Sequence, residues 1–479
     1  MRWLRALGVL LVSVALVVPA RADQGDATVP PGIAVPVTPA NSVVALIDTG
    51  INPYSPAFRD PSRLGRTPPW KYIPGFPKNT PALHLSLGLP YKKAVKKDEK
   101  VWAAVEAKKL YWIPGTRIVG VISLGAGGTN CPVVAAPPAN LAGGGDCAEH
   151  RILDDHGHGT MTASRAAGSP NSLAPRARIV EIEGLGAGSV EWAADQGWID
   201  VQSNSWISFV PPPVPNGVIT AFREAAKKML VLAGSGNGAA FSQGAAPTPT
   251  QLLSTAPEGV VIVGGHDNGK MTLWSGAPPH VVADAYAGMT AIAHSTERMR
   301  PDPIACCTSA ASPYAAGGAV AIIENARRLL GDDSVGIRKG VVASGSADVP
   351  WIEKGSPLAD GEFTLDELKE VFLHTAQARP ETYRDDGDVH WAGDPRAPDY
   401  TEYGLGGNPF CPLCTTAPVE WKAIPQDASA YQLIGFGAID EASLESALAV
   451  LHGSAEMPQR ALEDQQYALD QQQREQLYP

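Results

Sequence analysis

Residues 42–50 read SVVALIDTG, a short apolar run that ends in an acid, a threonine and a glycine. An uninterrupted run of this kind predicts a strand of a parallel sheet that is buried on both faces. Four later runs repeat the pattern: ARIVEIEGL (177–185), VQSNSWI (201–207), MLVLAGSGN (229–237) and GVVIVGGHD (259–267). Helical stretches such as NGVITAFREAAKKM (216–229) lie between them. The alternation predicts an α/β fold with a mostly parallel central sheet flanked by helices, whose functional residues gather where the strands end.

The overall charge bears on which partners the protein can have. The chain has 479 residues and a formal net charge of −11 at pH 7. An acidic surface does not favour the phosphate backbone of nucleic acids, so we expect no nucleic-acid partner.

The first 22 residues have the features of a signal peptide. Arg2 and Arg5 precede an apolar stretch, and Ala20-Arg21-Ala22 is a small-x-small cleavage site. The alternative is an uncleaved membrane anchor, but the apolar stretch is short for a spanning helix. We therefore expect a secreted, extracellular protein without stable membrane insertion after cleavage, with residues 23–41 as an N-terminal extension.

Six cysteines fit an oxidising compartment, where disulfide bonds form. A bridge from Cys131 to Cys147 would close a loop rich in glycine and proline. Cys411 and Cys414 can instead be half of a zinc site, although the chain has no second CxxC pair, which disfavours metal. Cys306 and Cys307 complete the set and can pair with them.

Three stretches look peripheral to the α/β core. Residues 52–150 are irregular and proline-rich, with one basic helical candidate at 90–110, and residues 378–433 are rich in Asp, Pro, Gly and aromatics. We expect both to be insertions. The segment 456–479 has a bias to Gln, Glu and Asp, which predicts a flexible C-terminal tail, either a frayed helix or a disordered segment.

Two segments with acid and imidazole side chains suggest acid–base chemistry. Asp48 follows a buried strand, where an acid is costly unless it is paired, although an ordinary turn also begins this way. Residues 154–164, DDHGHGTMTAS, contain His156 and His158 among small residues that permit close backbone approach. The same HxH can bind zinc, but no third ligand lies nearby in sequence.

Two further segments carry an amide and a hydroxyl. Asn237 ends the run at 229–237, where its side chain can donate to an oxyanion or merely adopt a left-handed turn. Ser309 precedes a run of tiny residues that predicts a buried helix. There it can cap the helix, or its hydroxyl can act as a nucleophile near free backbone N–H groups.

Taken in order, Asp48, His158, Asn237 and Ser309 match the arrangement of subtilisin-type proteases. ALIDTGI, HGHGTMTAS and TSAASPYAAG resemble the Asp, His and Ser motifs of the subtilase family, secreted bacterial type. The resemblance implies a three-layer subtilisin-like fold over residues 42–455. Too few residues precede Asp48 for a folded pro-domain, in which respect the chain is similar to the mycosin-like branch.

The resemblance also implies a role for each site residue. Ser309 would be the nucleophile, His158 the general base, Asp48 its orienting acid and Asn237 an oxyanion donor. The matching substrate-binding positions are Ser205, Trp206, Ile207, Gly234, Ser235 and Gly236. Cys307 and Ile207 depart from the family, since glycine is usual at both positions.

The expected function is that of a secreted serine endopeptidase acting on proteins or peptides through an acyl-enzyme. The alternative is a catalytically weakened subtilase that binds peptides or a partner, which Cys307 and Ile207 favour. The resemblance implies no required cofactor and no catalytic metal. It allows a structural calcium ion, for which no ligand loop stands out. It leaves the oligomeric state open.

Overall fold

The computed structural model describes most of the regular structure of the chain. The described residues are 41–124, 152–154, 156–168, 172–206, 217–236, 257–267, 270–271, 279–285, 291, 295–296, 308–332, 340–345, 352–377 and 435–477. The predicted signal peptide, the insertion at 378–433 and all six cysteines lie outside them, as does the N-terminal extension apart from Asn41. Within the described part of the chain, no helix has the length and apolar character needed to cross a membrane.

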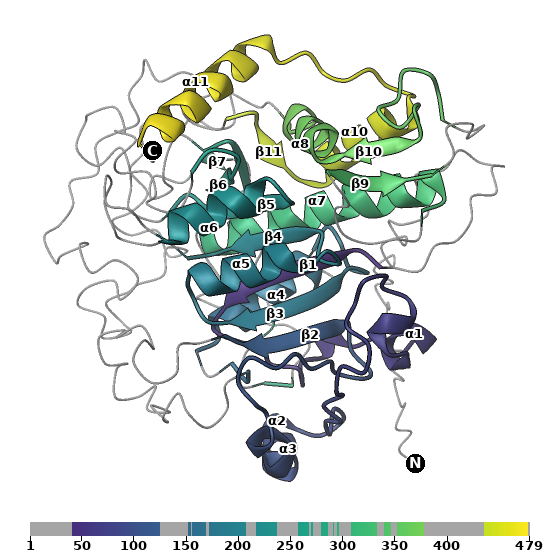
Figure 1. Ribbon diagram of the computed structural model, residues 1–479, viewed down its shortest axis with the longest axis vertical. Helices are drawn as coiled ribbons and strands as arrows, with labels where there is room; N and C mark the ends of the chain where they lie inside the picture. Colours follow the sequence, from purple (N-terminus) through teal and green to yellow (C-terminus); the bar gives the residue numbers. More distant parts are fainter. Residues whose placement is uncertain are drawn as a thin grey trace, which may run out of the picture.

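A nine-stranded sheet forms the centre of the molecule, in the order β11-β8-β6-β5-β4-β1-β3-β2, with β7 antiparallel to β6 (Figure 1). All other strand pairs in this sheet are parallel. The strands are β1 (Val43–Asp48), β2 (Ile118–Ser123), β3 (Arg178–Glu183), β4 (Val201–Asn204), β5 (Leu230–Gly234), β6 (Val261–Asp267), β7 (Lys270–Met271), β8 (Val281–Asp284) and β11 (Ala438–Ile439). All five strands predicted from the sequence are among them.

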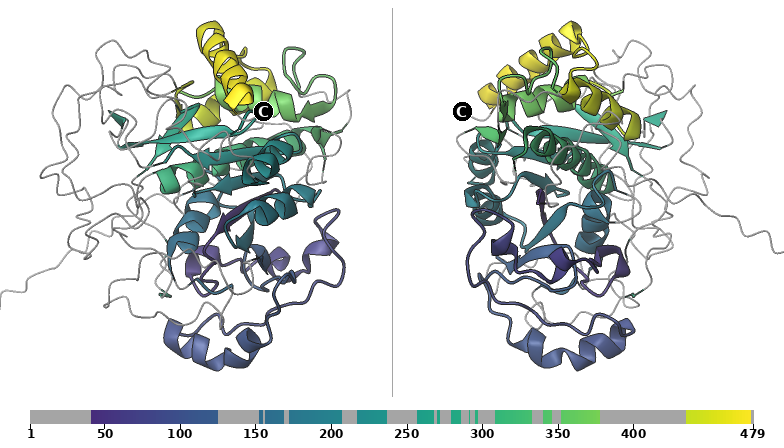
Figure 2. Two further views of the ribbon diagram at one scale, coloured as in Figure 1. Left: turned by 60° about the vertical axis from the view of Figure 1, so that its left-hand side comes forward. Right: turned by 90° about the vertical axis from the view of Figure 1, so that its right-hand side faces the viewer.

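Helices cover both faces of the sheet, as the sequence predicts (Figure 2). Helices α5 (Ala187–Asp195) and α6 (Gly217–Ala226) pack on one face, in a core that contains Phe222 and Trp198. The other face is covered by α4 (His158–Ala167), α7 (Thr308–Leu330), α8 (Leu365–His374) and α10 (Glu441–His452). A hairpin of β9 (Val341–Ser344) and β10 (Glu362–Thr364) follows α7.

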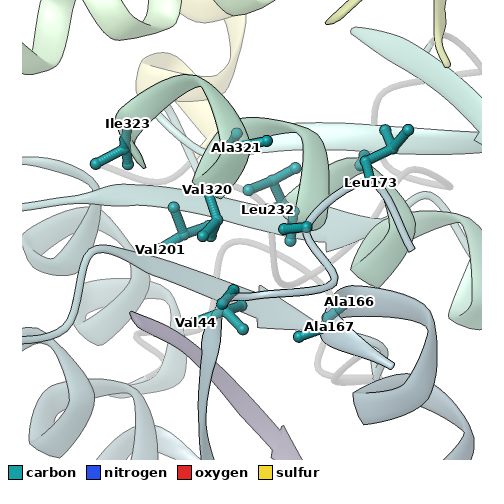
Figure 3. Packing of buried hydrophobic residues seen from close by; sticks show 14 of the residues in the cluster. Val44, Ala166, Ala167, Leu173, Val201, Leu232, Val320, Ala321 and Ile323 are labelled. Atoms are coloured by element: carbon teal, nitrogen blue, oxygen red, sulfur yellow. The ribbon is translucent and has the colours of Figure 1, made fainter. Parts of the chain in front are cut away.

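Helix α7 is buried over almost its whole length, because its small residues let it approach the sheet closely. Figure 3 shows Val320 and Ala321 of α7 beside Val201 and Leu232 of the central strands. Near the other end of α7, Arg327 forms a buried ion pair with Asp200, with Nη1–Oδ2 at 2.9 Å. Asp200 also accepts the backbone N–H of Val43, so the pair holds α7 over the start of β1.

The segment 52–150 differs from the insertion that we expected. It supplies β2, which pairs with β3 and forms one edge of the central sheet. The predicted basic helix is two helices, α2 (Tyr91–Lys97) and α3 (Glu99–Ala103), since the Asp98 side chain turns inward to accept hydrogen bonds from Tyr54 and Ser86. The remaining elements here are η1 (Pro56–Phe58), α1 (Arg63–Arg66) and η2 (Pro69–Lys71).

The C-terminal segment also differs from the flexible tail that we expected. It forms helix α11 (Ala461–Leu477), at the opposite end of the molecule from α2 and α3 (Figures 1 and 2). Asp470 of α11 contacts buried His280 at 2.8 Å, and Gln471 accepts the Gly259 N–H. Polar pairs with the body therefore order a helix whose composition alone indicated fraying or disorder.

Candidate active site

Asp48 is the last residue of β1 and lies at the edge where the parallel strands end. Its side chain is buried, and each carboxylate oxygen has a donor from the protein. The Thr49 N–H donates to Oδ1 at 2.8 Å, and the Thr162 hydroxyl donates to Oδ2 at 3.1 Å. These bonds compensate for burial of the acid and hold it in one orientation.

His158 is the first residue of α4 and lies directly over Asp48. Gly157 before it has φ 98°, a left-handed conformation that glycine adopts without strain and that turns the chain into the helix. The His158 Nδ1 and Asp48 Oδ1 atoms are 2.7 Å apart. Burial lowers the pKa of His158, but the charge and hydrogen bond of Asp48, with the charge of Asp154, outweigh it, so the net pKa is raised.

Asp154 organises the loop before α4, a role that we did not predict. Its carboxylate receives five hydrogen bonds, from the N–H groups of His156, Gly157 and Thr160 and from the hydroxyls of Thr160 and Thr49. Thr49 Oγ1 in turn accepts the N–H of the residue after His158. The available signal was a second acid close to the HxH motif, since an acid that accepts nearby N–H groups is typical of such turns.

His156, the alternative metal ligand, has an exposed side chain. The centre of its ring is 6.2 Å from that of His158, which is bound to Asp48 instead. Over the described residues, no three His, Cys, Asp or Glu side chains are grouped so that they could hold a metal ion.

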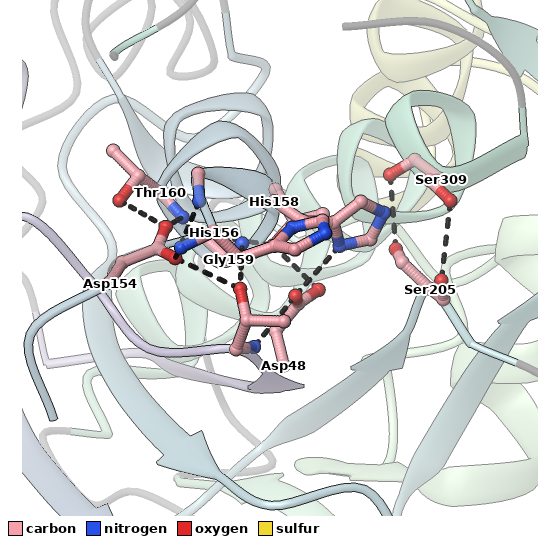
Figure 4. Close-up of polar contacts among 11 residues, drawn as sticks. Asp48, Asp154, His156, His158, Gly159, Thr160, Ser205 and Ser309 are labelled. Carbon is pink, nitrogen blue, oxygen red and sulfur yellow. Dashed lines mark hydrogen bonds and ion pairs between the residues drawn. The ribbon is translucent and has the colours of Figure 1, made fainter. Parts of the chain in front are cut away.

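Ser309 lies in the first turn of α7, one residue after the helix begins, rather than at the cap position. It exchanges two hydrogen bonds with Ser205, which follows β4. The Ser309 hydroxyl donates to the Ser205 carbonyl at 3.2 Å, and the Ser205 hydroxyl donates to the Ser309 carbonyl at 3.0 Å. In Figure 4 the His158 ring lies between Asp48 and Ser309, so the fold gathers the three side chains at one place.

The predicted substrate-binding positions are only partly described. The Trp206 ring packs on Phe222 of α6 at 5.5 Å, so the indole is turned towards the core of that face. Ser235 is buried and its N–H donates to the Val263 carbonyl. A Cβ on Gly234 would lie 3.0 Å from Thr308 Oγ1, which explains the glycine beside the start of α7. Gly236 has φ 86°, while Ile207, Asn237 and Cys307 lie outside the described residues.

Comparison with known proteins identifies the family. The model of the subtilase family, peptidase S8, matches residues 40–387. No curated protein sequence matches the chain. Among solved structures, the chain is similar to the epidermin leader peptide processing serine protease EpiP from Staphylococcus aureus, with 13% identity, a TM-score of 0.41, and coverage of 86% of this chain and 77% of that one.

A second similar structure is the protease domain of PatA, with 14% identity and a TM-score of 0.34. It covers 62% of this chain and 83% of that chain. The family match spans most of the chain, including the segments that carry Asp48, His158 and Ser309. The chain therefore belongs to the subtilase family, and it is a serine-type endopeptidase with a subtilisin-like α/β fold.

Proposed function

We propose that the chain cleaves peptide bonds with Asp48, His158 and Ser309 as its catalytic triad, through an acyl-enzyme. The observation that carries the proposal is the 2.7 Å bond between buried Asp48 and His158 at the first residue of α4. A carboxylate in this position stabilises the tautomer of His158 that has its proton on Nδ1. The Nε2 lone pair is then free to accept a proton.

In the reaction, the Ser309 hydroxyl attacks the carbonyl carbon of the scissile bond. Its proton passes to Nε2 of His158, which later returns it to the leaving amine, and water then hydrolyses the ester. The hydroxyl must first leave the Ser205 carbonyl. Catalytic hydrogen bonds are often long or poorly aligned before substrate binds, so the present 3.2 Å contact of Ser309 with Ser205 is compatible with a catalytic bond to His158 in the substrate complex.

The oxyanion of the tetrahedral intermediate needs donors beside Ser309. The first N–H groups of α7 lack partners within the helix, so the Ser309 N–H is suited to this position. We assign Asn237 as the second donor, on the sequence pattern at the end of β5. One donor of this type contributes roughly 10²–10³-fold in kcat.

We also propose that the chain is exported, with residues 1–22 removed as a signal peptide. The basic start, the short apolar stretch and the small-x-small site support this proposal. Protein or peptide substrates outside the cytoplasm would then be its targets.

A fluorophosphonate probe tests the assignment of the nucleophile, since it labels an activated serine. We expect labelling of the wild type and none of Ser309→Ala. Ser312→Ala is the matched control, because Ser312 lies one turn further along α7, buried beside Ser203. It should be labelled like the wild type. If Ser309→Ala is labelled as strongly as the wild type, or if a folded wild type is not labelled at all, Ser309 is not the nucleophile.

A further inference from the structure

Glu181 is a buried carboxyl group next to the site that the proposed reaction does not use. It lies in β3 with no exposed surface, opposite Leu46 in the neighbouring strand β1, two residues before Asp48. Its side chain is on the face of the sheet that α4 covers, as its contact with the start of that helix shows.

The contact is made with the residue that follows His158. A Cβ built on Gly159 would lie 2.9 Å from Glu181 Oε1 and 2.1 Å from the Gly50 carbonyl. The Glu181 carboxyl group thus packs directly beneath the first turn of α4, where only glycine fits. A change in its size or charge would act on the turn that holds His158.

Glu181 and Asp154 are both fully buried, but their surroundings are opposite. Asp154 has its five donors, which are arranged to stabilise a carboxylate anion. Neither oxygen of Glu181 has a hydrogen-bond partner of normal geometry among the described residues. An isolated carboxylate is strongly disfavoured in such a place, whereas a neutral carboxylic acid is tolerated.

The surrounding charges also favour the neutral form of Glu181. Burial raises the pKa of Glu181 well above its usual range, and the negative charges of Asp48, Asp154 and Glu183 raise it further. The nearby Gly50 N–H acts to lower the pKa of Glu181, but the net pKa stays raised. On the α4 side, Glu181 lies against the helix turn that begins at His158, and His158 itself is bound to Asp48.

We propose that Glu181 is held as a neutral carboxylic acid in the working enzyme and is a positioning residue for the Asp48–His158 pair. The inference rests on the proposed function. The neutral group supports the first turn of α4 without adding a further negative charge beneath His158. Asp48 is thereby left as the acid that contacts the imidazole.

Infrared difference spectroscopy tests the protonation state. At neutral pH we expect the carbonyl band of a protonated carboxyl group in the wild type, absent from Glu181→Gln and retained in Glu183→Gln. Glu183 is the matched control, since it lies two residues along β3 and accepts a bond from Ser123. If Glu181→Gln does not fold, the wild type can be labelled with ¹³C-glutamate instead. The same carbonyl band should then be shifted relative to the unlabelled wild type. Absence of such a band in the wild type would overturn the proposal.

Kinetics test the positioning role. Glu181→Gln should keep kcat and the acid limb of the kcat/KM profile, because a neutral group replaces a neutral group of the same shape. Glu181→Ala should lose about tenfold or more in kcat with little change in KM, since small displacements of catalytic groups are costly. Wild-type kcat in Glu181→Ala would refute positioning. If the acid limb of the kcat/KM profile of Glu181→Gln lies about one pH unit below that of the wild type, Glu181 is ionised in the wild type.

Failure of the proposed function would be recognised separately. If the wild type is not labelled by fluorophosphonate, the Ser309 assignment fails, while the infrared band still reports the proton on Glu181. If labelling succeeds and the band is missing, only the proposal for Glu181 fails.

Discussion

Replacing Asp48 with asparagine removes the charge beside His158 while almost conserving the shape of the side chain. The Asp48–His158 contact is 2.7 Å long, between side chains that are 3% and 16% exposed. Opposite charges centred about 4 Å apart attract by about 4 kcal/mol at an effective dielectric constant of about 20. A hydrogen bond to a charged group adds about 1.5–3 kcal/mol.

The imidazolium that forms when His158 takes the Ser309 proton would lose most of this stabilisation. Since about 1.4 kcal/mol corresponds to tenfold in rate, we expect kcat to fall by about 10⁴-fold, the loss known for this change in serine-protease triads. KM should change little, because Asp48 lies behind His158 rather than against substrate.

The assay is initial-rate hydrolysis of a peptide library pool with wild type and Asp48→Asn, alongside circular dichroism and thermal unfolding. Asp60→Asn is a matched carboxylate-to-amide control, since Asp60 pairs with Arg178 instead. It should keep kcat. A folded Asp48→Asn that loses less than about tenfold in kcat would refute the reasoning, because the charge would then contribute under about 1.4 kcal/mol.

Three other predictions concern His158, Arg327 and His280. The raised pKa of His158 should place the acid limb of kcat/KM above pH about 6.5, the ordinary histidine value, because the base must be neutral; a limb below that value in the pH profile would contradict it. Arg327→Met should lower the free energy of unfolding in urea by about 3–5 kcal/mol, since Asp200 stays buried without the Arg327 guanidinium. A loss of less than about 1 kcal/mol would mean that the ion pair is dispensable for stability. Burial lowers the pKa of His280 although Asp470 opposes this, so the folded state binds its proton less readily than the unfolded state. The stability that neutral His280 contributes is therefore complete above pH about 6.5 and is lost as the pH falls. On acidification, the free energy of unfolding of the wild type should fall relative to that of His280→Asn. Parallel curves of unfolding free energy against pH for the two proteins would contradict this prediction.

The order of the main strands and helices could be predicted from sequence, because burial on both faces of a parallel sheet produces apolar runs that are visible locally. The small residues after Ser309 likewise indicate a helix pressed close to the sheet, which α7 confirms. Strand β2 was not predicted, since it lies within a proline-rich segment whose composition resembles a loop. The ordered packing of helix α11 was not predicted, because His280 and Asp470, 190 residues apart in the chain, hold the helix in place.

The identities of Asp48, His158 and Ser309 as candidate site residues came from local motifs and their order along the chain. Their mutual geometry did not, because Asp48 and His158 are 110 residues apart and meet only when β1 and α4 pack together. The difference between Asp154 and Glu181 is likewise a property of the tertiary structure alone. Both are acids in the sequence, but the fold surrounds one with N–H and hydroxyl donors and the other with nearby negative charges and the backbone of Gly50 and Gly159. Charge state in a protein interior depends on such surroundings, which residues distant in sequence supply.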